Sequence, residues 1–290
     1  MTVANFIPKI WAAQMIWDFR QQAWAAQLAN REYEGDAQRG NTVHITSGVP
    51  VTISDYRTGL VDNGAGGTVP RTTEPEPVAS TGQDLLIDQE KSFDFLVDDI
   101  DRRQAAGSMD SYSADAAEGL AEDADLFLFA SAAAGASAAN KLTGAGVAPA
   151  TGDDAFDILN DLGKQLTKAP NKTPKSQRVA MINAEFAALL TGANSKLTDV
   201  DRSGVSETLR DAVLGRLLGF TVIESENLPV TDAPYALTFY RPALAYVSQI
   251  SETEAMRADK SFSDRLRGLH VYGGKVIRPK NVATWAVGTV

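Results

Sequence analysis

The stretch that decides the fold consists of two runs, residues 41–54, NTVHITSGVPVTIS, and residues 84–97, DLLIDQEKSFDFLV. Both runs alternate apolar with polar side chains, which is the pattern of a strand with one buried face. Between them lie residues 55–83, which are rich in Gly, Thr, Pro and charge and contain almost nothing to bury. This gap exceeds the ~12–15 residues above which connections without secondary structure become uncommon in compact domains. The gap is therefore either disordered or a segment that reaches outward.

If the two runs pair, they form a long ribbon with no core beneath its tip. An isolated two-stranded ribbon is marginally stable in water, and its open edges favour contact with another chain. The sequence therefore predicts an arm whose supporting surface lies outside its own domain, on a neighbouring copy of the same protein.

Charge and composition exclude several classes of function. The 290 residues include 27 Lys and Arg against 37 Asp and Glu, a net charge of −10, which argues against binding nucleic acid or anionic membranes through charge. The chain has no cysteine, so disulfides, thiolate metal sites and a cysteine nucleophile are excluded. The N-terminus lacks the pattern of a signal peptide, and the uncharged residues 126–140 are shorter than the ~18–20 residues of a membrane span. We expect a soluble protein with no membrane partner.

Residues 8–33 are predicted to be helical, because Ile10, Trp17 and Trp24 recur every seven positions. With Trp11, three tryptophans fall within the first 24 residues. This pattern fits an aromatic arm that docks on another subunit, and it equally fits a helix packed on its own domain.

The remaining elements follow from apolar spacing and from caps. A long helix is predicted from a cap at Ser113 or Asp115 to about residue 134, with acidic side chains in its first half and an apolar stripe that broadens towards its end. After a Gly/Ala/Pro linker at residues 141–152, a helix capped by Asp153 is expected. The later predictions are a buried strand at 178–182, a helix at 184–190, strands at 217–223 and at 235–250 with Pro242 interrupting the latter, and a terminal pair of strands at 269–277 and 282–287.

Neither histidine points to a catalytic site. His44 and His270 both lie in strand-like runs, and neither has a second histidine at the spacing of a metal site. We interpret both as strand residues.

Two groups of carboxylates deserve separate interpretation. One group matches the first half of a calcium-binding loop, at Asp199, Asp201, Ser203 and Gly204. The twelfth position of such a loop should be Glu and is Arg210, so a surface loop is favoured. The other group is Asp98, Asp99 and Asp101. Because Arg102 and Arg103 follow directly, an ion-paired, solvated turn is favoured over a metal site or a general acid and base. An acidic-cluster metal-dependent hydrolase is thus the less favoured alternative, and no catalytic, cofactor or metal-binding residue is assigned.

The order of these parts resembles the major capsid proteins of tailed double-stranded DNA bacteriophages, which have the Hong Kong 97-type fold. Four local runs carry the similarity: FIPKIW at residues 6–11, GNTVHI at 40–45, LLIDQEKSFDFLVDDID at 85–101 and LGRLLGFTVIESENLP at 214–229. The similarity in the order of parts covers nearly the whole chain.

This resemblance implies an α+β fold with a definite division of the chain. The implied parts are an N-terminal arm at 1–40; β-strands and an extended E-loop at 41–98, with its tip at about 54–90; a peripheral domain with a long spine helix at 99–150; an α/β axial domain at 151–250; and C-terminal strands at 251–290 that return to the peripheral domain.

The resemblance also implies a function. Copies of the chain would assemble in the host cytoplasm into hexamers and pentamers of an icosahedral shell, the capsid of a virion that encloses double-stranded DNA without sequence-specific binding. Scaffolding, portal and decoration proteins are further partners that the family suggests. A cellular protein nanocompartment of the same fold is the alternative, and a bound cargo peptide would be its mark.

The contacts that hold such a shell are expected to be noncovalent. Some family members crosslink through an E-loop lysine, but residues 55–83 contain no lysine, and Lys91 stands at the base of the loop. We hypothesise that the E-loop and the arm supply the intersubunit contacts, through Arg57, Arg71, Glu74 and Glu76 and through Trp11, Trp17 and Trp24.

Overall fold

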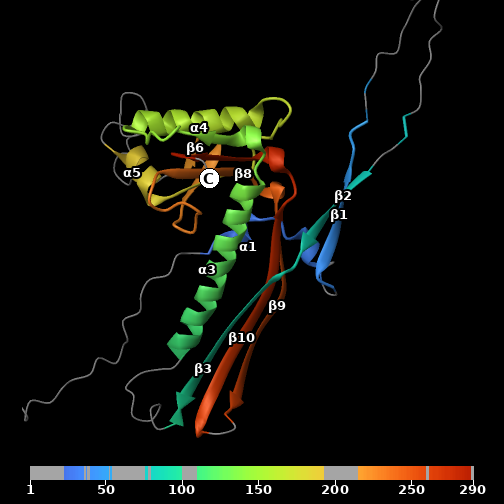
Figure 1. Ribbon diagram of the computed structural model, residues 1–290, viewed down its shortest axis with the longest axis vertical. Helices are drawn as coiled ribbons and strands as arrows, with labels where there is room; N and C mark the ends of the chain where they lie inside the picture. The colour runs from blue at the N-terminus through green and yellow to red at the C-terminus, as the bar shows by residue number, and fades with distance from the viewer. Residues whose placement is uncertain are drawn as a thin grey trace, which may run out of the picture.

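The computed structural model describes residues 23–35, 37, 40–51, 53, 76–77, 80–99, 110–192, 215–258 and 261–288. These residues form helices together with three separate sheets, so the predicted α+β class is confirmed. Figure 1 shows a compact part at the top, a long sheet with a helix beside it below, and a ribbon that leans away from both. No helix in the described residues is long and apolar enough to span a bilayer.

A six-stranded sheet forms the centre of the compact part. Its strands, in spatial order, are β4 (Lys141–Thr143), β11 (Val282–Ala286), β8 (Tyr235–Tyr240), β5 (Arg178–Ile182), β7 (Phe220–Glu224) and β6 (Arg216–Leu217). Helices α4 (Gly152–Thr167) and α5 (Ala184–Thr191) cover one face, and the second half of α3 (Asp110–Gly135) covers the other. Strand β5 lies in the middle and is buried along its whole length, as its continuous apolar pattern predicts.

A three-stranded antiparallel sheet forms the long part. Its order is β3 (Gln89–Asp98), β10 (Ser263–Val276) and β9 (Leu244–Arg257), and α3 runs along one of its faces (Figure 1). At ~1.5 Å per residue the helix is about 39 Å long. It therefore contacts both sheets, and the predicted long helix is confirmed.

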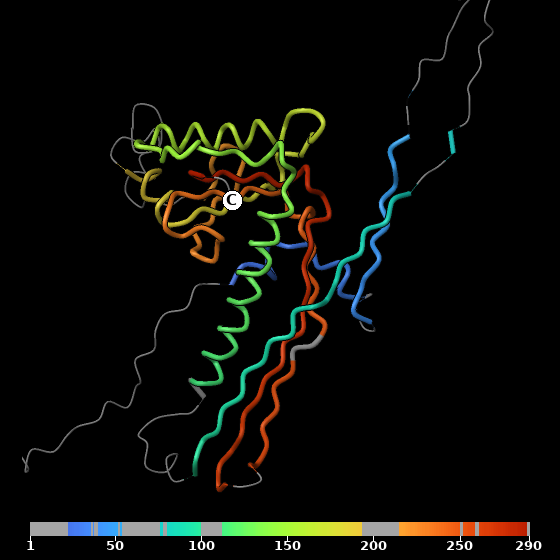
Figure 2. The backbone as a smooth tube through the Cα atoms, viewed as in Figure 1, coloured from blue at the N-terminus to red at the C-terminus, as the bar shows by residue number. Residues whose placement is uncertain are grey.

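The ribbon is formed by β1 (Thr42–Gly48) and β2 (Ser80–Leu86), which are antiparallel. Its root packs on β9 and β10, where Val43, Ile45 and Leu85 belong to a small core cluster with Ala245 and Val271. Figure 2 shows the ribbon leaving the body from this root. The first predicted run therefore pairs as expected, but its partner strand begins at Ser80, inside the region assigned to the tip.

The second predicted run is not one strand. Residues 84–86 end β2, and β3 begins at Gln89 and pairs with β10 instead of β1. The chain crosses β10 between them, where a Cβ on Gly273 would lie 2.2 Å from the carbonyl oxygen of Leu86. The alternation continues across the crossing because each half buries its apolar residues against a different partner, so the pattern could not reveal the break.

The predicted N-terminal helix is much shorter in its described part. Residues 8–22 lie outside the described residues, and α1 covers only Ala25–Leu28. A 3-10 turn, η2 (Glu32–Gly35), follows. The helix ends because Asn30 pairs with β9: its N–H donates to Leu244 O at 2.8 Å, and its carbonyl accepts from Tyr246 N at 3.0 Å.

One prediction about strand pairing is wrong, and one predicted strand is divided in two. Strands β10 and β11 are not a pair, because β11 lies between β8 and β4 in the six-stranded sheet, where Trp285 packs edge-on against Phe186 of α5. Residues 217–223 form two strands, since Leu218 and Gly219 have φ of 52° and 87° and make a left-handed turn between β6 and β7. Pro242 does interrupt residues 235–250, in η4 (Arg241–Ala243).

Three predicted boundaries also shift. Helix α3 begins at Asp110, so Ser113 and Asp115 lie inside it and do not cap it. Thr151 caps α4 instead of Asp153, in a capping box with Asp154. The predicted linker begins with a strand, because β4 pairs with β11. The short turns η3 (Ala138–Asn140) and η5 (Pro279–Asn281) complete the described elements.

Candidate interaction surfaces

Two of the seven predicted contact residues fall within the described part of the chain. Trp24 is half-buried, and Glu76 is exposed. The other five lie outside the described residues: Trp11, Trp17, Arg57, Arg71 and Glu74.

Trp24 is held by the long helix of its own chain. The carboxylate of Asp125 on α3 accepts the backbone N–H of Trp24 at 2.6 Å and that of Ala25 at 2.7 Å. The Trp24 side chain packs against the core cluster that contains Leu28. Of the two alternatives left by the sequence, the described end of the N-terminal segment therefore follows the second and packs on its own domain.

Asp125 is a buried carboxylate and the sequence reasoning missed it. Burial raises its pKa, while the hydrogen bonds from Trp24 and Ala25 oppose that rise. The two N–H groups are orphan donors at the start of α1, so the carboxylate acts as a cap supplied by a distant helix. A signal did exist, because Asp125 precedes buried Phe129 by four residues and so lies on the apolar stripe of α3.

The segment after α1 is tied along β9. The Glu34 carboxylate accepts from Ser248 N at 3.3 Å and from Arg31 Nε at 2.8 Å. Gln249 Nε2 donates to the carbonyls of Ala37 and Gly40, at 2.8 and 2.9 Å. The described residues between Trp24 and the start of the ribbon are therefore held on β9 at Asn30, Glu34, Ala37 and Gly40.

The root of the ribbon is similarly fixed. Gln83 Nε2 donates to Ile277 O at 3.2 Å, and Lys275 Nζ donates to Asp84 O at 2.6 Å. His44 Nδ1 lies 2.6 Å from Asp84 Oδ1 in an exposed cross-strand pair, in keeping with its interpretation as a strand residue.

Beyond its root the ribbon exposes apolar side chains. Val49 is 43% exposed, Val51 65% and Ile53 97%. These residues continue the alternation that buries Val43 and Ile45, but nothing in the described part of the chain covers them. Among the described residues they form an exposed apolar edge.

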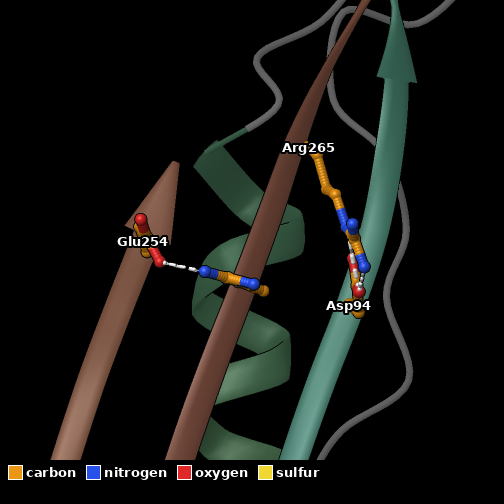
Figure 3. A network of polar contacts seen from close by, with 4 residues as sticks. Asp94, Glu254 and Arg265 are labelled. Atoms are coloured by element: carbon orange, nitrogen blue, oxygen red, sulfur yellow. Dashed lines mark hydrogen bonds and ion pairs between the residues drawn. The ribbon is translucent and has the colours of Figure 1, made fainter. Parts of the chain in front are cut away.

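The face of the long sheet turned away from α3 carries ion pairs. Phe95 lies 6.2 Å from Tyr112 of α3, so the alternating neighbour Asp94 projects from the opposite face. There Arg265 Nε donates to both carboxylate oxygens of Asp94, at 2.8 and 3.0 Å. On the same strand Arg267 Nη2 donates to Glu254 Oε2 at 2.6 Å (Figure 3). The hydrogen bond from Arg265 lowers the pKa of Asp94.

The free end of this sheet carries a second group of ion pairs. Arg257 joins Asp99 and Asp264, at 2.9 and 2.8 Å from its Nη1, which raises the pKa of the guanidinium. Asp99 of the predicted acidic elbow is therefore ion-paired, but to Arg257 of β9, whereas Arg102 and Arg103 lie outside the described residues. The exposed apolar side chains at this end are Leu96, Leu269 and Phe262.

Polar contacts at the middle of the sheet connect it to α3. Asp123 accepts the hydroxyl of Tyr272 at 2.6 Å and pairs with Lys91 Nζ at 3.3 Å. His270 Nε2 lies 3.1 Å from Ser248 Oγ, and burial lowers the pKa of this ring, in keeping with its interpretation as a strand residue. The described residues contain no cluster of three or more His, Asp or Glu that could hold a metal, and the Asp199 loop lies outside them.

Comparison with known proteins finds matches among solved structures, most of them from bacteriophages. No protein-family model and no curated protein sequence matches the chain. Among solved structures, one from Mycobacterium phage Che8 is 45% identical over 98% of both chains, with a TM-score of 0.84. The capsid of Cyanophage P-SCSP1u shares the fold at 17% identity, over 100% of this chain and 95% of that one, with a TM-score of 0.76. The mature capsid of bacteriophage PhiM1 does so at 14% identity, over 98% and 93%, with a TM-score of 0.71.

Proposed function

The chain belongs to the bacteriophage major capsid proteins and forms an icosahedral shell, and we propose that the ribbon and the N-terminal segment supply the contacts between its copies. The nanocompartment alternative is not favoured, because the relative at 45% identity is a phage structure. The phage capsid neighbours point to a structural protein of the virion and not to an enzyme.

One observation carries the proposal. The ribbon is packed on its own body at Val43 and Ile45 but exposes Val51 and Ile53 a few residues further on. Burying one such side chain stabilises a contact by about 1.5–3 kcal/mol. A neighbouring copy of the chain is the partner that a shell provides at every position, and many modest contacts add up through multivalency.

The N-terminal segment is proposed as a second contact. Its anchored end, at Trp24 and Ala25, is fixed to α3 by Asp125, so the preceding 23 residues start from a defined point on the body. Trp11 and Trp17 are proposed to clamp a neighbour, while Trp24 serves in the anchor. On the E-loop, Arg57, Arg71, Glu74 and Glu76 remain the proposed charged contacts.

We further propose that the shell encloses double-stranded DNA without sequence-specific binding and is assembled in the host cytoplasm. The net charge of −10 supports a container that DNA enters, since condensation on DNA would need a basic surface. We also propose a division of the chain into five parts: arm (1–40), ribbon with E-loop (41–98), peripheral part (99–150), axial part (151–250) and terminal strands (251–290). Of the terminal strands, β11 lies beside β8, a strand of the proposed axial part. Scaffolding, portal and decoration proteins are proposed as further partners.

The test replaces the exposed apolar edge of the ribbon with charge. The double variant Val51→Asp with Ile53→Asp should lower the yield of shells at least about tenfold. A loss of about 1.4 kcal/mol of contact free energy already weakens an association by a factor of ten. Val147→Asp is the matched control, because Val147 is 72% exposed but lies on the turn after β4. Shell yield is measured by light scattering on a size-exclusion column and by negative-stain electron microscopy. Equal yields from both variants would reject the ribbon contact.

A further inference from the structure

A cluster of cations, which we call the basic corner, lies on three loops at the edge of the compact part nearest the ribbon. Its members are Lys168, Lys172, Lys175, Arg241, Arg278 and Lys280. The loops are residues 168–177 after α4, residues 241–243 and residues 277–281, and none of them contains Asp or Glu. The rest of the chain carries the other 21 of the 27 cations against all 37 anions. The corner is thus opposite in charge to the molecule around it.

Hydrogen bonds fix the three loops to one another. They run from Asn281 Nδ2 to Thr173 Oγ1 at 2.7 Å, from Arg241 N to Gln177 O at 3.2 Å, and from Arg278 N to Ala243 O at 3.4 Å. The buried guanidinium of Arg178 also donates to Pro174 O at 2.8 Å and so holds the first loop from below. The corner is therefore a preformed surface, and binding to it costs little ordering of the backbone.

A hollow of about 750 Å³ separates the corner from the root of the ribbon. Arg241 and Arg278 line it from one side, and residues 45–48 of β1 line it from the other. The buried Nε of Arg241 has no hydrogen-bond partner among the described residues. Among the described residues that line the hollow, the acid is Glu32, whose carboxylate accepts from Asn30 Nδ2 at 3.2 Å. An incoming carboxylate would meet the two guanidinium groups of Arg241 and Arg278.

The size of the hollow and the charge of the chain favour a protein partner over DNA. An extended peptide segment with acidic side chains fits a hollow of this volume, whereas a rigid DNA duplex is too broad to enter it and would touch only its rim. The shell places acidic copies of this chain side by side, so a basic surface beside the ribbon meets an acidic neighbour. We infer that the basic corner binds an acidic segment of a neighbouring copy in the shell. The inference rests on the shell role given above and adds a contact surface to it.

Zero-length crosslinking tests this contact. Shells assembled from equal amounts of ¹⁴N- and ¹⁵N-labelled protein are treated with a carbodiimide, which joins a lysine to a carboxylate in direct contact, and the joined peptides are identified by mass spectrometry. Lys168, Lys172, Lys175 or Lys280 should be found in links of mixed isotope composition. Lys91 and Lys164 are internal controls, because they already pair with Asp123 and Asp161 of their own chain and should give links of one isotope. Shells whose corner lysines give no mixed links would overturn the inference and leave the shell role intact.

A charge variant separates the protein partner from DNA. Lys172→Glu with Lys175→Glu should lower shell yield in DNA-free assembly severalfold, whereas Lys172→Arg with Lys175→Arg should leave it unchanged. Both lysines are exposed, so folding should be preserved, and circular dichroism checks this. If the Glu variant assembles normally but retains less duplex DNA in a filter-binding assay, DNA is the partner and the inference is wrong. If neither property changes, it is also wrong.

Discussion

The two larger sheets of this protein are stabilised in opposite ways. The six-stranded sheet lies between α4 and α5 on one face and α3 on the other, and its central strands have no exposed apolar residue. The free end of the three-stranded sheet has no core on its outer face and holds together through ion pairs such as Arg265 with Asp94. A subunit with one self-sufficient part and one extended part suits a shell, because the open face of the extended sheet is available for contact with other copies.

The largest difference between the two regions should appear when the same residue type is truncated in each. Phe239 on β8 is fully buried, with its ring 6.5 Å from that of Phe129, so Phe239→Ala should lower the free energy of unfolding by about 3–5 kcal/mol. Phe262, at the turn between β9 and β10, is 82% exposed, and Phe262→Ala should change the free energy of unfolding by less than about 0.5 kcal/mol. Urea unfolding of the full-length subunit measures both values. Equal costs would contradict the contrast between the sheets.

The same contrast explains how much the sequence could predict. The buried strand at 178–182 and the helix that begins at 184 were predicted almost to the residue, because their apolar patterns are strong. The apolar pattern assigned no strand to residues 251–268, and only the family resemblance implied strands there; β9 and β10 continue through most of this stretch, but its few apolar residues give no periodic signal. A hydrophobic pattern indicates which side chains are buried, and this end of the hairpin buries few.

Strand order was the second thing that pattern could not give. The place of β11 between β8 and β4 depends on long-range packing of Trp285 against α5 and not on its neighbours in sequence. Of the predicted contact residues, Trp24 lies in a site of a different kind, since its backbone is anchored by Asp125 and its ring by the core. The role of Asp125 could have been found by looking for a carboxylate on the apolar stripe of the long helix. A search for ligand-binding motifs does not look for such a residue.

The second-largest effect on stability is expected at Asp125, which anchors the N-terminal segment to the helix that contacts both sheets. Asp125→Ala leaves two backbone N–H groups without an acceptor, so the free energy of unfolding should fall by about 1–3 kcal/mol. Hydrogen exchange at the amides of Trp24 and Ala25 should rise at the same time. Glu118→Ala, at an exposed position on the same helix, is the control and should change neither quantity. Protection that stays high in Asp125→Ala would mean that the anchor lies elsewhere.

The anchor should also make stability depend on pH. The pKa of Asp125 is raised in the folded chain, chiefly by burial, so the folded state holds this proton more tightly than the unfolded state does. The resulting stabilisation is fully present below the ordinary Asp value of 3.8 and is lost as pH rises through the folded pKa. The free energy of unfolding of Asp125→Asn, measured from pH 3 upward, should therefore lack the part of the decline that the wild type shows. Parallel profiles for the two proteins would exclude this linkage.

The smallest effect is expected from the ion pairs of the long sheet. Arg267 and Glu254 are 47% and 57% exposed, so their coupling in a double-mutant cycle should be only about 0.2–1 kcal/mol in the unassembled subunit. Raising the salt concentration to 1 M, where the Debye length is about 3 Å, should reduce it further. In assembled shells the coupling should increase if a neighbouring copy covers this face, because exclusion of water strengthens a charge pair. A coupling that is the same in subunits and shells would show that this face stays in solvent, and that the extended sheet is stabilised by assembly somewhere else.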